Sequence, residues 1–145
     1  MNATMPAHST TPSASSNGLH LGLWAVQVLL ALAFLGAGML KLITPIGLLA
    51  SRVDWVGTVP ATLVRFIGVS ELLGALGLIL PAATRIKPVL TGLAALGLTV
   101  VMVLAVGVHV ARGEGTLFAL PLLLGVLAAF VAWGRLTQVS LDAQD

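Results

Sequence analysis

The sequence predicts an all-α integral membrane protein, folded as an up-down-up-down bundle of four helices. The first observation behind this prediction is a set of four long apolar stretches, at residues 21–40, 61–80, 89–108 and 117–133. About 20 apolar residues at helical rise cross the hydrocarbon core of a bilayer, so each stretch is of spanning length. The second is composition, because 58% of the 145 residues are hydrophobic and only 8% are charged. A soluble domain of this size could not cover so much apolar surface with so few charges.

The tryptophans are the third observation. Trp24 is near the start of the first apolar stretch and Trp133 closes the fourth, so four crossings would put both on one side of the membrane. Trp55 lies between the first two stretches, on the other side. Indole rings favour the headgroup region, so these positions fit two aromatic belts. The short connections between stretches indicate antiparallel neighbours.

The first helix, at 21–40, contains one strongly polar side chain, Gln27. We expect it to end near Ile43, because Pro45 disfavours helical backbone in the residue before it. The segment 1–18 is rich in Ser, Thr, Pro and Ala and carries no charged side chain, which predicts a disordered tail. A signal peptide would carry Lys or Arg ahead of its apolar run, so we expect this helix to be retained.

The connection at 44–59 is the longest. Its apolar residues alternate with polar ones, a pattern that suits a short helix lying on the membrane surface. Pro60 suits the first turn of the second helix, where its missing N–H costs nothing. Pro81 is expected to end that helix, before a short basic turn at 82–87.

The second half of the chain follows the same logic. Pro88 is expected to open the third helix, and the segment 112–115, with two glycines and two charges, predicts a tight loop after it. Pro121 falls in the first turns of the fourth helix, where proline is tolerated. We therefore expect one membrane domain at 21–136, an N-terminal tail at 1–20 and a short C-terminal tail at 137–145.

The cations give the orientation. The side with both termini carries Arg85, Lys87 and Arg135, and the other side carries Lys41, Arg52 and Arg112. Because Lys41 falls in the last turn of a helix rather than in a loop, the count favours cytoplasmic termini. The prediction is a multi-pass protein of the cell membrane, with the lipid bilayer as its surroundings.

Composition also excludes several classes of function. The formal charge is only +2 and the cations are scattered, which is too little for a nucleic-acid-binding surface. The chain has no cysteine, so disulfides, thiol redox chemistry, iron–sulfur clusters and thiolate metal sites are excluded. No metal site and no cofactor can be identified from the sequence.

Glu71 is the first candidate functional residue, because it falls inside the second apolar stretch. Counting from Pro60 at about 1.5 Å per residue puts it about 16 Å deep, near the middle of the bilayer. A charged side chain at a helix centre costs about 2.5–3.5 kcal/mol on insertion scales. Glu71 must therefore be protonated, paired or facing a wet cavity, and small neighbours that admit a second helix favour an inward position. The predicted helix-packing residues are Gly68, Gly74, Ala75 and Gly77.

Three basic side chains are expected in the same half of the membrane as Glu71. Lys41 ends the first helix, Arg65 lies in the first turns of the second, and His109 is near the end of the third. We expect Lys41, Arg65 or both to hold Glu71, while the opposite half has little beyond Gln27. Simpler alternatives stay open, because helix-end cations usually extend their charged ends to the interface and a buried glutamate can be purely structural.

These residues also carry a family resemblance. The segments are FLGAGMLKL at 34–42, Pro60, IGVSELLGALGLILP at 67–81, and a third helix with Met102, Ala105 and His109. Together they resemble the DoxX-like family of small four-helix membrane proteins, over roughly residues 24 to 134. The resemblance implies that Lys41 and Glu71 match a characteristic charged pair of the family, and that Arg65 and His109 match positions that are commonly polar. It brings no catalytic assignment.

The resemblance also implies a range of roles, because family members are linked to quinone oxidoreductases, to oxidative-stress complexes and to membrane-protein assembly. One hypothesis is a non-autonomous accessory subunit linked to quinone-associated redox or to complex assembly. If catalytic at all, it would be a subunit of a quinone-linked oxidoreductase. In that hypothesis the polar cluster binds a quinone headgroup, and a redox or membrane-protein partner is expected.

Two other hypotheses stay open. A glutamate in the middle of a small bundle also suits a dimeric, proton-coupled transporter of small molecules. The third hypothesis is a purely structural assembly factor, in which the polar cluster only fixes helix register.

Overall fold

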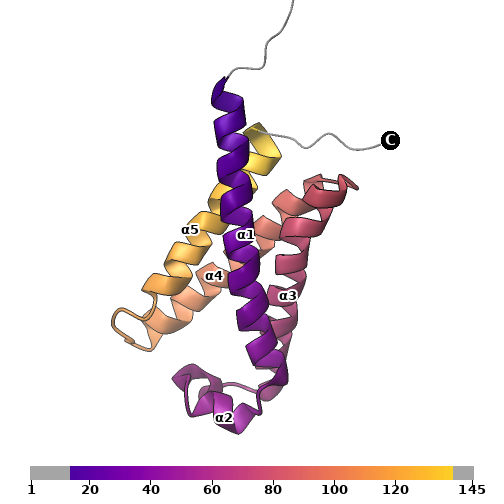
Figure 1. Ribbon diagram of the computed structural model, residues 1–145. Coiled ribbons are helices and arrows are strands. Elements are labelled where there is room, and N and C mark those ends of the chain that lie inside the picture. Colours follow the sequence, from indigo (N-terminus) through magenta and orange to yellow (C-terminus); the bar gives the residue numbers. More distant parts are fainter. Residues whose placement is uncertain (1–13, 139–145) are drawn as a thin grey trace, which may run out of the picture.

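A computed structural model describes residues 14–138 of the chain (Figure 1). Within this range the protein is helical and contains no strand. The elements in chain order are α1 (Ala14–Ile43), α2 (Ile46–Ala50), the 3₁₀-helix η1 (Asp54–Thr58), α3 (Ala61–Thr84), α4 (Val89–Ala111), α5 (Ala119–Trp133) and the π-helical turn η2 (Gly134–Gln138). The all-α prediction is confirmed, and four helices within residues 14–138 are long and apolar enough to cross a membrane.

The four long helices form an antiparallel bundle. Helix α1 packs on α3, α3 on α4 and α4 on α5, with a smaller contact between α5 and α1. The beginning of α1, the α3–α4 turn and η2 lie at the upper end in Figure 1, whereas α2 and the α4–α5 loop lie at the lower end. This is the up-down-up-down arrangement that short connections predicted.

The core is thin, and most of the apolar surface points outward. Its largest buried side chains include Leu30, Phe34 and Leu98. Only 28–39% of an 18-residue apolar window in each spanning helix is buried within the chain. Large apolar side chains such as Leu32, Phe66 and Val103 are exposed on the outside. A surface of this kind suits hydrocarbon or another membrane helix rather than water.

The structure corrects three predicted boundaries. Helix α1 begins at Ala14, so residues 14–20 are helical rather than part of a disordered tail; an apolar helix that is already nucleated extends cheaply into Ala and Ser residues. The rest of the predicted tail, 1–13, lies outside the described residues. At the other end, residues 137 and 138 belong to η2 rather than to the C-terminal tail, and 139–145 lie outside the described range.

Pro81 is the third correction, because it lies inside α3 instead of ending it. A proline removes one backbone N–H donor and crowds one carbonyl group of the preceding turn. Close to the end of a helix, this bends the helix more readily than it ends it. The helix ends after Thr84, where Arg85 adopts a left-handed backbone with φ of 57°. Pro60 and Pro88 directly precede α3 and α4, as expected.

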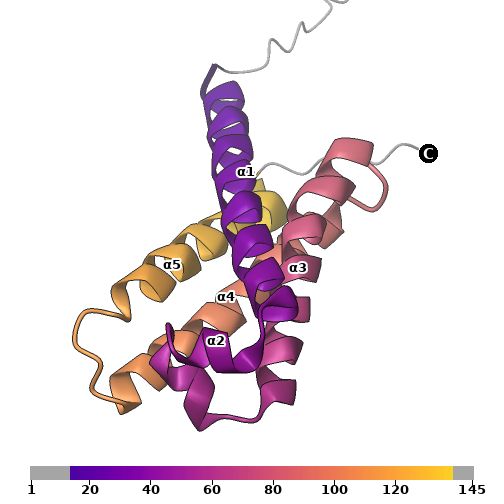
Figure 2. The ribbon, with the colours of Figure 1, turned by 60° about the horizontal axis from the view of Figure 1, so that its bottom comes forward.

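The long connection folds back on the bundle. Figure 2 shows α2 and the following segment across the lower end of the long helices. Leu49 of α2, Val56 of η1 and Val64 of α3 form a small hydrophobic cluster of their own. The predicted short surface helix is therefore present as α2, but part of its apolar side is buried against η1 and α3 rather than against lipid.

Candidate functional site

The antiparallel packing of α1 and α3 brings Lys41 onto Glu71. Lys41 lies in the last turn of α1, and Glu71 lies near the middle of α3 and is 3% exposed. The Lys41 Nζ atom donates to both carboxylate oxygens, at 2.9 Å to Oε1 and 2.8 Å to Oε2. The two ionic groups therefore satisfy each other inside the chain. We call this contact the Lys41–Glu71 pair.

Two glycines let the helices approach closely enough for this pair to form. A Cβ atom on Gly38 of α1 would lie 2.8 Å from the carbonyl oxygen of Gly68, and a Cβ on Gly68 would lie 2.9 Å from the Cβ of Lys41. Neither position has room for a side chain without moving backbone. Close approach through small residues is typical of membrane helices, and it sets the register in which Lys41 meets Glu71.

The other predicted packing residues serve a different interface. A Cβ on Gly74 would lie 2.5 Å from Cδ2 of Leu98, and one on Gly77 would lie 2.6 Å from the Cβ of Ala94, both in α4. Ala75 is buried in the main core. Helix α3 thus has one small-residue contact with α1 beside Glu71 and a second with α4 further along.

Arg65 lies near the pair but does not contact Glu71. Its guanidinium donates to the carbonyl oxygen of Lys41 through Nη1, and to that of Thr44 through Nη2 at 2.9 Å. These carbonyls belong to the end of α1, where backbone acceptors lack helical partners. Of the two expected partners of Glu71, Lys41 makes the ion pair, and Arg65 closes the end of α1.

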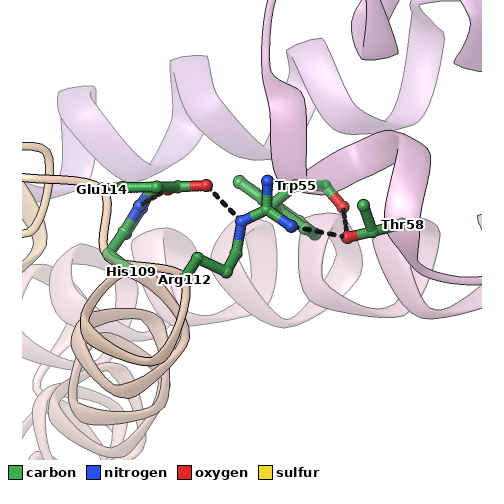
Figure 3. A network of polar contacts seen from close by, with 5 residues as sticks. All are labelled: Trp55, Thr58, His109, Arg112 and Glu114. Atoms are coloured by element: carbon green, nitrogen blue, oxygen red, sulfur yellow. Dashed lines mark hydrogen bonds and ion pairs between the residues drawn. The ribbon is translucent and has the colours of Figure 1, made fainter.

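His109 belongs to a separate arrangement at the lower end of the bundle, which we call the loop network (Trp55, Thr58, His109, Arg112 and Glu114; Figure 3). Its Nδ1 atom lies 2.5 Å from Oε2 of Glu114, and the other oxygen of Glu114 accepts from Arg112 Nε. Arg112 Nη1 also reaches Thr58 Oγ1 at 3.2 Å, and this hydroxyl donates to the carbonyl of Trp55. The network ties the α4–α5 loop to η1.

Hydrogen bonds from Arg112, and next from His109, lower the pKa of Glu114 below its ordinary value. The carboxylate is therefore the form that holds the loop network together. Two glycines with positive φ, Gly113 at 65° and Gly115 at 52°, make the tight turn that points Glu114 back toward both bases. The four predicted site residues thus share one half of the bundle but form three separate arrangements.

The opposite end contains a polar cluster that was not predicted from the sequence. Arg135 of η2 is 5% exposed, and its Nε donates to Oε1 of Gln27 at 2.5 Å. Gln27 is fully buried and donates to the carbonyl of Leu78 at 2.8 Å. The guanidinium also lies 5.5 Å from the ring centre of Trp24, and its Nη1 is 3.3 Å from Nδ1 of His20. We call these four side chains, Arg135, Gln27, Trp24 and His20, the Arg135 cluster.

A signal for this cluster is present in the sequence. His20, Trp24 and Gln27 are spaced at four and three residues, which puts them on one face of a helix that begins before residue 20. A first helix that starts at Leu21 leaves His20 in the predicted tail, and Arg135 enters the sequence analysis only as one of the cations on the side with both termini. The earlier start of α1 and the π-helical turn after Trp133 bring them together.

Shallow apolar grooves lie between the helices, and two of them are formed by residues of the described range. One, of about 250 Å³, runs along α1 and α3 and is lined by Val28, Ala31, Leu32, Leu35, Ala75 and Ile79. The other, of about 230 Å³, lies between α4 and α5. Within residues 14–138, no three His, Asp or Glu side chains come together in a way that could hold a metal ion.

Comparison with known proteins gives one match. The model of the DoxX-like family matches residues 25–131, which include all or most of each of the four spanning helices. Neither the curated proteins nor the solved structures contain a match to this chain. The family match covers well over half of the sequence and contains Lys41, Arg65, Glu71 and His109. This multi-pass membrane protein therefore belongs to the DoxX-like family.

Proposed function

We propose that this protein is a non-autonomous accessory subunit that supports a larger membrane complex through its apolar outer surface. The observation that carries the proposal is the closed Lys41–Glu71 pair. Both carboxylate oxygens accept from the same ammonium group, so the charges of the pair neutralise each other within the chain. The pair holds α1 on α3 and leaves apolar faces as the main surface offered to a partner.

Exposed glycines support a partner that is itself a membrane helix. Gly36 of α1 and Gly97 and Gly107 of α4 are exposed, and a Cβ atom at each would meet nothing within 4 Å. Association inside a bilayer depends on close packing rather than on the hydrophobic effect, and small residues allow it. Each of these positions can receive a neighbouring backbone or side chain.

Purification in native lipid, followed by mass spectrometry of the proteins that remain bound, tests the proposal. Gly97→Leu combined with Gly107→Leu blocks the α4 surface, and Gly36→Leu is the matched change on α1. We expect one of the two variants to lose the bound partner while the other keeps it, at unchanged melting temperature. Partner binding that survives both changes, or a native preparation with no partner, would contradict an accessory role on these faces.

Quinone association is a second candidate function, favoured by the groove along α1 and α3. Ala75, which lines the groove, follows Glu71 by one helical turn, about 6 Å along the axis. An isoprenoid tail lying in the groove would bring its headgroup near the Lys41–Glu71 pair. The Lys41 side chain remains 17% exposed, so part of this residue can be reached from outside the chain.

Photo-crosslinking with a quinone analogue tests this candidate separately. Leu32→Trp fills the groove, and Leu96→Trp, at an exposed site on α4 outside both grooves, is its control. We expect Leu32→Trp and Glu71→Gln to reduce labelling, and Leu96→Trp and His109→Ala to leave it unchanged. Equal labelling of the two tryptophan variants would show that the groove does not hold the analogue.

A further inference from the structure

Arg135 is a buried cation without a counter-ion in the described part of the chain. The three ion pairs within residues 14–138 join other groups, and none includes Arg135. Its Nη2 atom is buried and has no hydrogen-bond partner there. Gln27, which accepts from Nε, is neutral. A buried charge is costly unless it is paired, so this arrangement lacks an anionic partner.

His20 makes the shortage of acceptors worse. Its Nε2 accepts from the indole N–H of Trp24 at 3.1 Å, and an indole nitrogen can only donate. A neutral imidazole has one acceptor nitrogen, so Nδ1 must then carry the proton. The contact of 3.3 Å between Nδ1 and Arg135 Nη1 therefore brings two donors together. Arg135 Nη1, Arg135 Nη2 and His20 Nδ1 all need an acceptor that these side chains do not supply.

The position of the cluster indicates where an acceptor would come from. Arg135 is three residues from Gln138, which ends the fourth spanning segment, so it lies near headgroup depth. His20 is partly exposed and gives access to the cluster from outside. The α3–α4 turn at the same end carries Arg85 and Lys87, both exposed. An anion would approach this end of the bundle favourably.

A second buried polar atom without a partner belongs to the same end. The Oγ1 atom of Thr91 is buried and makes no hydrogen bond with the described residues. Thr91 lies in the first turn of α4, which packs against η2, and a Cβ on the adjacent Gly92 would lie 2.5 Å from Cδ2 of Leu136. Buried polar groups are normally paired, so two orphans beside one short turn indicate a missing ligand or water.

We propose that the Arg135 cluster binds a phosphate-type oxyanion, supplied by the headgroup of an acidic phospholipid. The oxyanion accepts from Arg135 Nη1 and Nη2 and from His20 Nδ1, while Gln27 holds Nε and Trp24 lies beside the guanidinium. Guanidinium groups match phosphate geometry with two parallel donors. This site is independent of the Lys41–Glu71 pair and of the accessory role proposed above.

The test compares the full chain in nanodiscs of phosphatidylcholine alone, in the same nanodiscs with inorganic phosphate, and in nanodiscs that also contain phosphatidylglycerol. We expect phosphatidylglycerol to stay bound in native mass spectrometry and to raise the melting temperature. Stabilisation by inorganic phosphate but not by phosphatidylglycerol would support an oxyanion site whose ligand is a free ion, and would overturn the lipid headgroup as that ligand. Stabilisation by neither would overturn the proposal.

Variants separate the Arg135 cluster from general attraction to acidic lipid. Arg135→Gln should weaken phosphatidylglycerol binding roughly tenfold or more, because it removes a charge-assisted hydrogen bond to the headgroup. His20→Glu keeps the arginine and supplies an acceptor within the chain, so it should remain folded and lose the lipid response. Arg85→Gln combined with Lys87→Gln removes exposed charge at the same end and should keep most of the response. The proposal is overturned if Arg135→Gln keeps the response to phosphatidylglycerol while the Arg85→Gln and Lys87→Gln double variant loses it.

The acidic residues of the C-terminal segment are the competing occupant. Asp142 and Asp145 follow the described range and belong to the same chain. We expect Asp142→Asn combined with Asp145→Asn to leave phosphatidylglycerol binding unchanged. A lipid response that appears only in this double variant would show that the chain's own carboxylates fill the site, and would overturn lipid as its occupant.

Discussion

The two ends of the bundle treat a buried charge in opposite ways. At one end Lys41 and Glu71 form a closed ion pair, in which the carboxylate is almost fully buried and accepts two hydrogen bonds from Lys41. At the other end Arg135 is equally buried but contacts neutral groups. Burial alone therefore does not identify a binding site in this bundle. What distinguishes the two ends is whether the polar atoms are satisfied within the chain.

Breaking the Lys41–Glu71 pair should destabilise the protein most. Lys41→Met should lower the free energy of unfolding by about 3–5 kcal/mol, because it leaves the Glu71 carboxylate buried without a partner. Glu71→Gln should cost less than Glu71→Ala, since the amide keeps a hydrogen-bonding oxygen. Unfolding by denaturant in detergent micelles measures these differences.

The double variant is the control for this prediction. Lys41→Met combined with Glu71→Leu should recover most of the lost stability, because two apolar side chains replace two charges that satisfied each other. If the double variant is as unstable as Lys41→Met alone, the pair contributes more than charge neutralisation, and a simple structural role for it is wrong.

Close packing under the pair should come next in size. Gly68→Ala places a methyl group 2.9 Å from the Cβ of Lys41, so the helices must separate and the pair must lengthen. We expect a loss of about 1–3 kcal/mol, the usual cost of overpacking. Gly36→Ala, at an exposed site on α1 with nothing within 4 Å, should be neutral or slightly stabilising. Equal effects of the two changes would mean that the close approach at Gly68 is not needed.

Removing Arg135 should cost less than breaking the closed pair. Arg135→Met takes away a buried cation and leaves no opposite charge behind among the described residues, so only the acceptor of Gln27 loses its partner. We expect a loss of about 1–2 kcal/mol in phosphatidylcholine, the cost of one unsatisfied polar group. If Arg135→Met lowers the free energy of unfolding as much as Lys41→Met does, then Arg135 has an anionic partner. The two ends of the bundle would then not differ in how their buried charges are satisfied.

The fold could be predicted from the sequence because length and hydropathy dominate in a bilayer. Four uncharged or nearly uncharged stretches of spanning length leave few alternatives to four helices. The approach of Lys41 to Glu71 was also predictable, since antiparallel neighbours bring the end of one helix near the first half of the next. Apart from the family resemblance, the residues do not decide whether Lys41 or Arg65 makes the contact, because that depends on the rotation of α3 set by Gly38 and Gly68.

The Arg135 cluster was not predicted, although His20, Trp24 and Gln27 share a helical spacing, because two predicted boundaries separated its members. Hydropathy marks where a helix becomes apolar, not where its backbone hydrogen bonds begin, so the turn that contains His20 looked like tail. An arginine after the last apolar residue normally extends to the interface. Here the π-helical turn and the packing of Leu23 against Gly134 place Arg135 against α1 instead. Such packing against a distant segment leaves little trace in local composition.

Weakening the loop network should change the structure least, and its carboxylate, Glu114, lies outside the spanning segments. Because hydrogen bonds from Arg112 and His109 lower the pKa of Glu114, its carboxylate is favoured in the folded state. The stabilising contribution is therefore complete above the ordinary pKa of a glutamate and is lost as pH falls through the lowered value. Hydrogen exchange at Trp55 and Thr58 should speed up over that acidic range, while exchange around Gly68 changes less. Glu114→Gln should remove this pH dependence and leave η1 loosened at every pH, and an unchanged pH profile in that variant would show that another group controls the contact between η1 and the α4–α5 loop.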